Sequence, residues 1–295
     1  MIIPFGAAAD LLQPRSIDAT QPDPPAEILA LARNAVHGSL YEMHWREPFH
    51  TASTEMLDSA KRRAIKRLRA LPAEAEATPC TVPLVLPSTP GWGTYKWKYD
   101  PKLPQEAVGM GAPIIDTAET YGYGRCEKQL GEALEKKTFE HTLIATKVSR
   151  NHMGHANVLR AASRSAYALG NPLGLYQIHW PNPNEPIEGT MEAFNELLGI
   201  DIVRWVGVCN FSVDQFYRAR QTCPRLASIQ VRVEGLAGVL PYYQAMKIAV
   251  IAHSPLGQGR DVLVRKSVFQ WCYENCVTPI VGTNNIEHLR ENLTR

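Results

Sequence analysis

Four polar residues stand where they could move a proton to or from a small substrate. Asp116 follows the apolar run Ala112–Ile115, and Tyr121 comes five residues later in a glycine-flanked turn. Lys147 and His179 each stand at the end of a later apolar run. A carboxylate, a phenol, an ammonium and an imidazole are groups from which proteins build general acid–base sites. These residue types predict such a site, provided that the fold brings them together.

Lys147 is informative because the residues around it are mostly apolar. A buried ammonium needs a partner, and Asp116 on a neighbouring segment is well placed to be one. The same ammonium near Tyr121 would stabilise the phenolate and lower the pKa of the phenol from ~10 toward the working pH. Each residue taken singly has another explanation: Asp116 and Lys147 could form a purely structural ion pair, and His179 could be a structural histidine. The prediction rests on four compatible polar residues lying at the same end of three consecutive strand segments.

Short apolar segments and helix-compatible stretches alternate along most of the chain, which predicts an α/β protein. The expected strands are Trp92–Trp97, Pro113–Ala118, Leu143–Val148, Leu173–Trp180, Val203–Asn210, Ala227–Val233, Ile248–Ser254 and Pro279–Gly282. The expected helices include Glu127–Leu134, Val158–Ala168, Met191–Leu198 and Val268–Glu274. The alternation predicts a (β/α)₈ TIM barrel, shortened in places, with its active site at the carboxyl ends of the strands. A flavodoxin-like or Rossmann open sheet is the alternative, but no strand precedes a GxGxxG turn.

Residues 1–80 differ in composition from residues 81–295, and we expect an N-terminal extension ahead of the barrel. The extension is rich in Pro and Ala and holds one amphipathic helix candidate, Ser53–Leu71, with an apolar stripe and a cationic remainder. Such a helix could bind an anionic membrane or a nucleic acid. We favour packing on the barrel, because no aromatic side chains are interleaved to stack on bases.

The overall composition narrows the class of protein. A chain of 295 residues with a net charge of +2 has no basic excess, so we expect no nucleic-acid partner. No apolar run approaches the ~20 residues that cross a bilayer. Six cysteines without a CxxC pair favour free thiols and no metal site. The N-terminus lacks the pattern of a secretory leader, which favours a cytoplasmic protein, with an organelle as the alternative.

From Gly91 to Asn292 the sequence resembles the aldo-keto reductases in seven motifs, which occur in that family's order. The motifs are Gly91-Trp-Gly-Thr-Tyr95, Asp116-Thr-Ala-Glu-Thr-Tyr121-Gly, Ile144-Ala-Thr-Lys147, Leu175-Tyr-Gln-Ile-His179-Trp-Pro, Val203-Arg-Trp-Val-Gly-Val-Cys-Asn210-Phe-Ser, His253-Ser-Pro-Leu-Gly257-Gln-Gly259 and Pro279-Ile-Val-Gly282-Thr with Glu291-Asn292. The resemblance implies reduction of a small-molecule aldehyde or ketone, with NADPH as hydride donor and NADH as the alternative. It implies that Tyr121 donates the proton, Lys147 lowers the tyrosine's pKa, Asp116 supports Lys147, and His179 orients the substrate carbonyl.

The resemblance also implies where the cofactor and the substrate lie. Asn210 and Gln230 would hold the nicotinamide carboxamide, Ser254–Gln258 would follow the pyrophosphate, and the loop from Gly282 to Asn292 would hold the adenosine end. Trp97 and Trp180, with Tyr121 and His179, would line the substrate site. The full set of implied cofactor contacts is Thr94, Tyr95, Asp116, Cys209, Asn210, Gln230, His253, Ser254, Leu256, Gln258, Gly282, Thr283, Asn284, His288, Glu291 and Asn292.

The chain departs from the family's pattern around the cofactor. His253 stands where the family usually stacks a tyrosine on the nicotinamide, and Cys209 replaces a common serine. The loop that meets the 2′-phosphate carries asparagines and His288, which leaves Arg290 as its only strong cation and weakens the expected preference for NADPH. The segments 100–116 and 259–267 are short for the family's helices and loops. These departures favour two alternatives, a non-catalytic NADPH-binding subunit resembling the potassium-channel β subunits, and a destabilised product of deletion.

Overall fold

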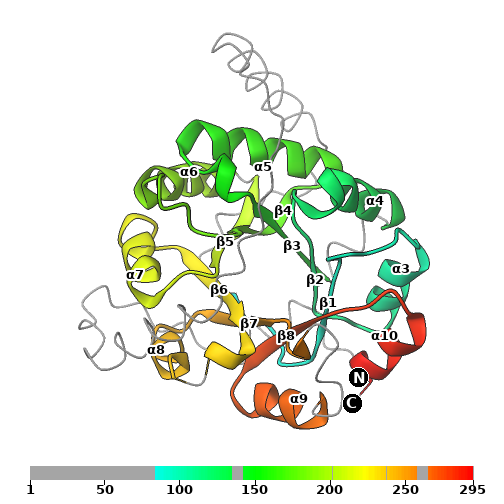
Figure 1. Cartoon of the computed structure of the whole chain (residues 1–295). Helices are drawn as coiled ribbons and strands as arrows, with labels where there is room; N and C mark the ends of the chain where they lie inside the picture. Colours follow the sequence, from blue (N-terminus) through cyan, green and yellow to red (C-terminus); the bar gives the residue numbers. More distant parts are fainter. Residues whose placement is uncertain (1–83, 135–141, 201, 237, 258–264, 295) are drawn as a thin grey trace.

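Eight parallel strands close into a barrel in the order in which they occur along the chain. The computed structural model describes residues 84–134, 142–200, 202–236, 238–257 and 265–294. The view along the barrel in Figure 1 shows the helices as an outer ring around the strands. The predicted (β/α)₈ class is therefore confirmed. The predicted boundary near residue 80, the helix candidate Ser53–Leu71 and Gln258 lie outside the described residues.

Each strand of the barrel falls on one of the apolar segments expected from the sequence. The first two strands are only three residues long, and the later residues of the expected segments Trp92–Trp97 and Pro113–Ala118 belong to loops. The bounds are β1 (Gly91–Gly93), β2 (Ile114–Asp116), β3 (Leu143–Val148), β4 (Leu173–Ile178), β5 (Val203–Cys209), β6 (Leu226–Arg232), β7 (Ala249–His253) and β8 (Val277–Gly282). Pairing of β1 with β8, through Gly93 and Gly282, closes the ring.

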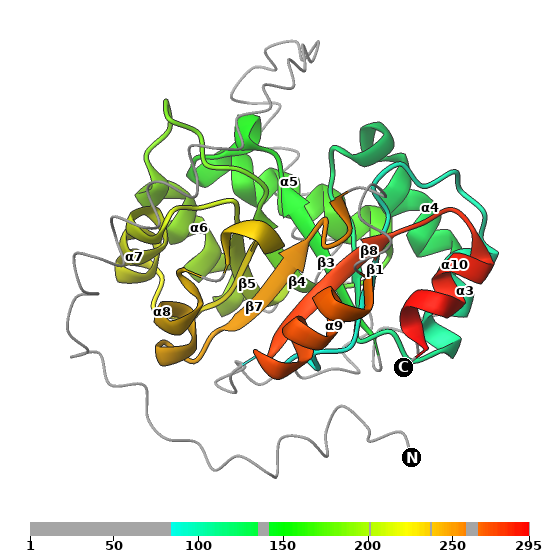
Figure 2. The same cartoon turned by 60° about the horizontal axis from the view of Figure 1, so that its bottom comes forward.

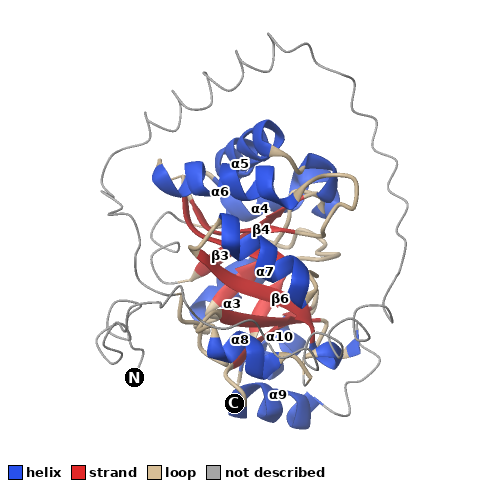
Figure 3. Ribbon diagram, turned by 90° about the vertical axis from the view of Figure 1, so that its left-hand side faces the viewer, coloured by secondary structure: helices blue, strands red, loops and turns tan. Residues whose placement is uncertain are grey.

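Helices of the described residues follow every strand and cover the outer face of the barrel (Figures 2 and 3). Their bounds are α3 (Lys102–Gly109), α4 (Arg125–Ala133), α5 (His155–Leu169), α6 (Ile187–Gly199), α7 (Val213–Thr222), α8 (Leu240–Ala245), α9 (Arg265–Glu274) and α10 (Ile286–Leu293). The short segment between Asp100 and Asp116 forms an eight-residue first helix after all, α3, which packs beside α10. Gly131 permits close packing of α4 on α5, because a Cβ there would lie 2.5 Å from the Ala168 carbonyl oxygen.

Two apolar layers stabilise the barrel. The larger one fills the space between the strands and the helices and includes Trp92, Tyr176, Phe194 and Phe216, all with no exposed surface. The smaller one includes Leu84, which packs with residues from the strands. Burial of such apolar area is the main source of stability in folded proteins.

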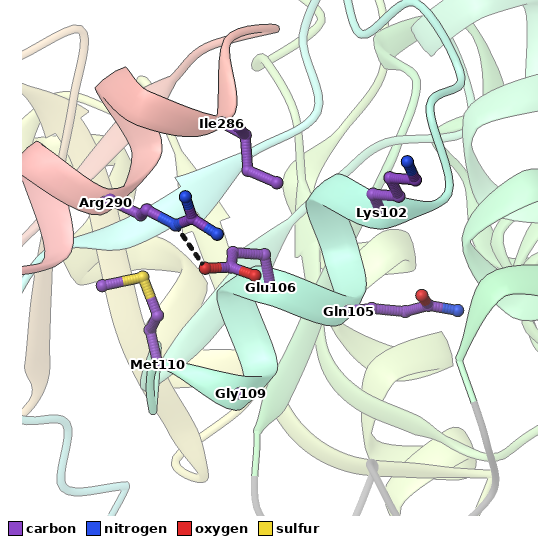
Figure 4. A pocket seen from close by; sticks show the side chains of 7 residues that line it. All are labelled: Lys102, Gln105, Glu106, Gly109, Met110, Ile286 and Arg290. Carbon is purple, nitrogen blue, oxygen red and sulfur yellow. Dashed lines mark hydrogen bonds and ion pairs between the residues drawn. The ribbon is translucent and has the colours of Figure 1, made fainter.

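A groove of about 620 Å³ lies between α3 and α10, outside the barrel (Figure 4). An ion pair joins the two helices there, with Arg290 Nε 2.7 Å from Glu106 Oε1. The groove holds none of the four residues expected to catalyse a reaction. Its lining is Lys102, Gln105, Glu106, Gly109, Met110, Ile286 and Arg290.

Within the described residues, no helix is both long and apolar enough to span a membrane. In the same part of the chain, no three His, Cys, Asp or Glu side chains gather in a way that could hold a metal ion. The five described cysteines carry free thiols, and they are Cys126, Cys209, Cys223, Cys272 and Cys276.

Candidate active site

An ion pair between β2 and β3 forms the base of the candidate site. Asp116 is the last residue of β2, and Lys147 is the penultimate residue of β3. Lys147 Nζ lies 2.7 Å from both carboxylate oxygens of Asp116 and donates a third bond to the Thr117 carbonyl at 2.8 Å. The lysine is only 1% exposed, and these three acceptors match the three protons of its ammonium. Breaking this pair would strand a buried charge.

Tyr121 opens the short 3₁₀ turn Tyr121–Gly124 that follows β2. The Lys147 ammonium lies 5.3 Å from the centre of its ring, and the His179 ring lies 5.5 Å away, edge to face. The turn depends on Gly122, whose φ is +57° and at which a Cβ would lie 2.0 Å from the Tyr99 hydroxyl. Tyr121, Lys147 and His179, which were expected to share one site, are therefore close together.

The pKa of Tyr121 is raised well above its ordinary value, mainly by burial and next by the negative charge of Asp116. Burial and the Asp116 charge thus act against the lowering expected from Lys147, and the effect of that ammonium on the phenol stays a prediction. The phenol is consequently protonated at neutral pH, which is the form that a proton donor needs.

His179 follows β4 and carries a neutral imidazole at neutral pH. Burial, followed by the charge of Lys147, holds the pKa of its ring well below the ordinary value. Its Nδ1 lies 3.4 Å from the Thr120 hydroxyl, which the sequence analysis did not single out. If the hydroxyl donates to Nδ1, the proton of the ring is on Nε2, where it can be donated. Thr120 has no signal of its own beyond its place next to Tyr121.

The residues at the ends of β5 and β7 contact one another. Asn210 has a φ of +60° and donates from Nδ2 to the His179 carbonyl at 3.1 Å and to Cys209 Sγ at 3.2 Å. Its Oδ1 lies 2.9 Å from Nε2 of His253, whose Nδ1 lies 3.3 Å from the Ser254 hydroxyl. Burial, and then the charge of Lys147, lowers the pKa of His253 to about 3. This imidazole is therefore neutral and can donate to Asn210.

Gln230 lies inside the barrel, where its side chain contacts protein groups. It is 1% exposed and donates from Nε2 to Asp116 Oδ1 at 3.1 Å, while its Oε1 accepts from Gln177 Nε2 at 3.1 Å. Ser228 donates in turn to Gln177 Oε1 at 3.4 Å. Gln177 and Ser228 were not expected at the site from the sequence, although both are polar residues within apolar strands. Gln230 supports Asp116 in this structure.

The aromatic side chains expected at the substrate site differ in exposure. Trp97 is 4% exposed and packs edge to face on Trp92 at 5.5 Å, so its place in the substrate site stays a prediction. Trp180 is 37% exposed, and Tyr95 is 39% exposed with its ring 5.3 Å from that of Tyr121. Tyr95 is therefore an exposed aromatic side chain beside the expected proton donor.

The start of the β8–α10 loop contacts the loop that follows β1. Asn284 accepts from the Lys98 backbone N–H at 2.7 Å and donates to the Lys96 carbonyl at 2.9 Å. The Thr283 carbonyl accepts from the Trp92 indole at 3.2 Å. Both lysines are exposed. The structure thus brings the backbone of two lysines to Asn284, which the local sequence does not show.

Arg290 does not serve this loop as a free cation, because its guanidinium is paired with Glu106 at 2.7 Å and Glu287 at 2.9 Å. Asn285 caps α10 by accepting from the N–H groups of Glu287 and His288.

The remaining residues expected to bind the cofactor differ in their contacts and in their exposure. Thr94 bonds to Thr117 and the Asp116 carbonyl, Leu256 is half-buried, Gly282 and His288 are exposed, and Glu291 and Asn292 contact Arg265.

Comparison with known proteins gives the same family from sequence and from structure. The model of the aldo/keto reductase family matches residues 90–262. Aldo-keto reductase YhdN of Bacillus subtilis is 31% identical over 198 residues, which are 62% of this chain and 59% of that protein. Methylglyoxal reductase YeaE of Escherichia coli is 30% identical over 172 residues, 55% of this chain and 60% of that protein. The chain thus spans about three-fifths of the length of these relatives.

A solved aldo/keto reductase from Klebsiella pneumoniae, in complex with NADP and acetate, superposes with a TM-score of 0.59 at 26% identity. The match covers 69% of this chain and 83% of that one. A thermostable aldo-keto reductase in complex with the inhibitor epalrestat gives a TM-score of 0.62 at 27% identity, over 70% of this chain and 89% of its own. This chain belongs to the aldo/keto reductase family.

Proposed function

We propose that the protein is an NAD(P)H-dependent oxidoreductase that reduces an aldehyde or ketone to an alcohol, with Tyr121 as proton donor. The observation that carries the proposal is the convergence of Asp116, Tyr121, Lys147 and His179 at the carboxyl ends of β2, β3 and β4. Active sites of (β/α)₈ barrels lie at this end of the strands. The similarity to a methylglyoxal reductase supports a small carbonyl compound as substrate class.

A reduced nicotinamide cofactor would supply the hydride that is added to the carbonyl carbon. The chain's own part is the proton, which moves from the Tyr121 hydroxyl to the carbonyl oxygen as that oxygen becomes an alkoxide. The raised pKa of Tyr121 keeps the proton in place until that charge develops. Lys147 can then stabilise the phenolate, because its ammonium lies 5.3 Å from the ring. Neutral His179 would orient the carbonyl by donating from Nε2.

The side chains at the ends of β5 and β7 suit the amide of a nicotinamide. The Asn210 oxygen keeps a second lone pair beyond its bond to His253, and it can accept a hydrogen bond from the amide nitrogen of the carboxamide. Cys209 adjoins it with a thiol whose pKa is raised to about 12 by burial, so the sulfur is uncharged. Asn210, Cys209 and His253 would therefore hold the carboxamide, while Gln230 supports Asp116.

NADPH is the proposed cofactor, with NADH as the alternative. The 2′-phosphate distinguishes the two by charge, and exposed Lys96 and Lys98 are attached to Asn284 through their backbones. These lysines would supply the cationic charge that Arg290 cannot, because Arg290 is paired with two glutamates. This proposal adds the β1 loop to the residues expected from the sequence.

The test is absorbance at 340 nm with NADPH and 4-nitrobenzaldehyde, followed by single-turnover hydride transfer in Tyr121→Phe. The substitution removes the proton and little else, so the rate should fall by ~10²-fold or more while NADPH still binds. Tyr123→Phe, at an exposed neighbour in the same turn, is the matched control and should keep the wild-type rate. Equal rates in wild type and Tyr121→Phe would show that this phenol is not the acid.

A non-catalytic NADPH-binding subunit is the second candidate, and the shortened elements of the barrel favour it, such as the three-residue strands β1 and β2. This candidate predicts that NADPH quenches tryptophan fluorescence while no aldehyde is consumed. The third hypothesis, a destabilised deletion product, predicts aggregation without a cooperative melt. A thermal melt, a binding titration with NADPH and the aldehyde assay at 340 nm together distinguish the three.

A further inference from the structure

Glu119 lies in the loop between Asp116 and Tyr121, and its carboxylate contacts the residue after β3, the 3₁₀ turn Arg150–His152 and Arg164 of α5. Oε1 accepts from the Ser149 backbone N–H at 2.5 Å and from Nδ1 of His152 at 2.8 Å. Oε2 lies 3.5 Å from the guanidinium of Arg164. The side chain is 10% exposed, so these bonds are largely shielded from water. None of its side-chain contacts is to a residue of the candidate site itself.

The backbone of Glu119 makes a second connection to the β3 segment, because its N–H donates to the Lys147 carbonyl at 3.2 Å. One residue thus bonds to the β3 segment twice, at Lys147 through its backbone and at Ser149 through its side chain. Tyr121 follows Glu119 by two residues in a turn whose Gly122 and Tyr123 both have a φ of +57°. These two residues interrupt the helical backbone, and the turn keeps only short-range bonds such as that from the Tyr123 N–H to the Thr120 carbonyl at 3.3 Å. Its position therefore also depends on the residues that anchor it.

We propose that Glu119 is a positioning residue that fixes the Tyr121 turn relative to Lys147 through the Ser149 N–H. The inference rests on the proposed function, in which the Tyr121 hydroxyl and the Lys147 ammonium act together. A displacement of about 1 Å at a reacting group can lower a rate by ~10²-fold. A looser Tyr121 turn would therefore slow proton donation without removing any group that performs it.

The charges around Glu119 suit this role. Burial alone would raise the pKa of its carboxyl, but the His152 hydrogen bond, with the Ser149 N–H and Arg164, outweighs burial and leaves the pKa lowered. Buried Glu127 of α4 faces the same region and is affected by the negative charge of Glu119. The carboxylate is therefore ionised at neutral pH, and its bond to the backbone N–H is charge-assisted.

The experiment compares two pairs of variants that remove or keep the same bond. Glu119→Ala deletes the acceptor, whereas Glu119→Gln keeps an oxygen for the Ser149 N–H. Ser149→Pro deletes the donor at a residue whose φ of −60° suits proline, whereas Ser149→Ala keeps the donor and removes only the hydroxyl that caps the next turn. Glu188→Gln on α6, an exposed carboxylate paired with Arg218, is the distant control.

Two measurements are made on each full-length variant with NADPH bound. Hydrogen exchange of the peptide covering 117–124 should be about tenfold faster in Glu119→Ala and Ser149→Pro, as expected for the loss of a charge-assisted bond. Single-turnover hydride transfer should be at least tenfold slower in the same two, with NADPH affinity within twofold of wild type. Glu119→Gln and Ser149→Ala should stay within threefold of wild type in both. The double variant Glu119→Ala/Ser149→Pro should be no slower than either single variant, because both remove one bond.

A purely structural role for Glu119 predicts a lower melting temperature with unchanged exchange at 117–124 and an unchanged transfer rate, and that result overturns the proposal. Slow transfer in Glu119→Gln equal to that in Glu119→Ala also overturns it, since the acceptor would then not be what matters. The wild-type comparison with Tyr121→Phe is separate and tests the proposed function on its own. If that comparison fails, exchange at 117–124 still shows whether Glu119 fixes the turn.

Discussion

Two sides of the barrel mouth are assembled in different ways. On the side of β2, β3 and β4, buried Lys147 contacts Asp116 at 2.7 Å, and the ends of consecutive strands carry the remaining groups. On the side of β8 and β1, exposed Asn284 contacts Lys96 and Lys98, which are 188 and 186 residues away in the sequence. The first side depends on buried charge and the second on surface contacts. Substitutions on the first side should therefore have the larger effects.

The largest effect is expected from Lys147→Met. The substitution leaves the Asp116 carboxylate buried without its cation, and it leaves the Tyr121 phenolate without a neighbouring charge. Turnover should fall by at least ~10²-fold, and stability should fall by about 3–5 kcal/mol, as for other broken buried pairs. Single-turnover kinetics and urea unfolding measure the two effects.

Two further variants sharpen this prediction. Lys128→Met removes an exposed lysine of α4 that lies 3.8 Å from Glu132, and it should change neither quantity measurably. Lys147→Met/Asp116→Asn should regain stability without regaining turnover, because the stranded charge is gone while the ammonium is still absent. Recovery of turnover in the double variant would contradict the role given to Lys147.

The buried side was largely predictable from sequence, because its residues lie in short motifs at the ends of apolar segments. Asp116, Lys147 and His179 could be placed by counting strands, since parallel strands of a barrel end on one face. The direction of the Tyr121 pKa could not be predicted, because it depends first on how deeply the folded chain buries the phenol. The same holds for Gln230, since only the closed barrel shows that its amide faces Asp116.

The exposed side was poorly predictable for a different reason. Asn284 looks like one polar loop residue among several, and nothing near it in sequence indicates that it bonds to the β1 loop. Trp97 illustrates the same limit, because its burial against Trp92 depends on how that loop folds back. Contacts between segments that are distant in sequence carry no local pattern. The barrel itself was predictable because its pattern repeats along the chain.

An effect of intermediate size is expected at Glu127 of α4, where the quantity affected is the dependence of stability on pH. This carboxyl is 3% exposed, accepts from the Thr146 hydroxyl at 2.5 Å, and has its pKa raised by burial to about 7. A native pKa above the unfolded value means that the stability this group contributes is complete below about pH 4.5 and is lost as pH rises through about 7. The loss should be on the order of 3 kcal/mol.

Urea unfolding at several pH values from 5 to 8 tests this prediction. Glu127→Gln should flatten the decline in stability and make the protein more stable than wild type at pH 8, since the amide can still accept from Thr146. Glu188→Gln, on the surface of α6, should leave the wild-type profile in place. A profile that Glu127→Gln does not change would show that another group controls the pH dependence.

The smallest effect is expected on the exposed side, from Lys98→Met. One exposed cation facing a phosphate contributes at most about 1 kcal/mol, so the dissociation constant of NADPH should rise about fivefold while that of NADH stays nearly constant. Titrations that follow tryptophan fluorescence measure both, and the NADPH effect should shrink as salt is added. His288→Gln provides the comparison within the β8–α10 loop, and Lys102→Met on α3 provides a cation control in the groove of Figure 4. If His288→Gln changes NADPH affinity more than Lys98→Met does, the charge that selects the cofactor lies in the β8–α10 loop. In that case the contact between the β1 loop and Asn284 serves only to hold the loops together.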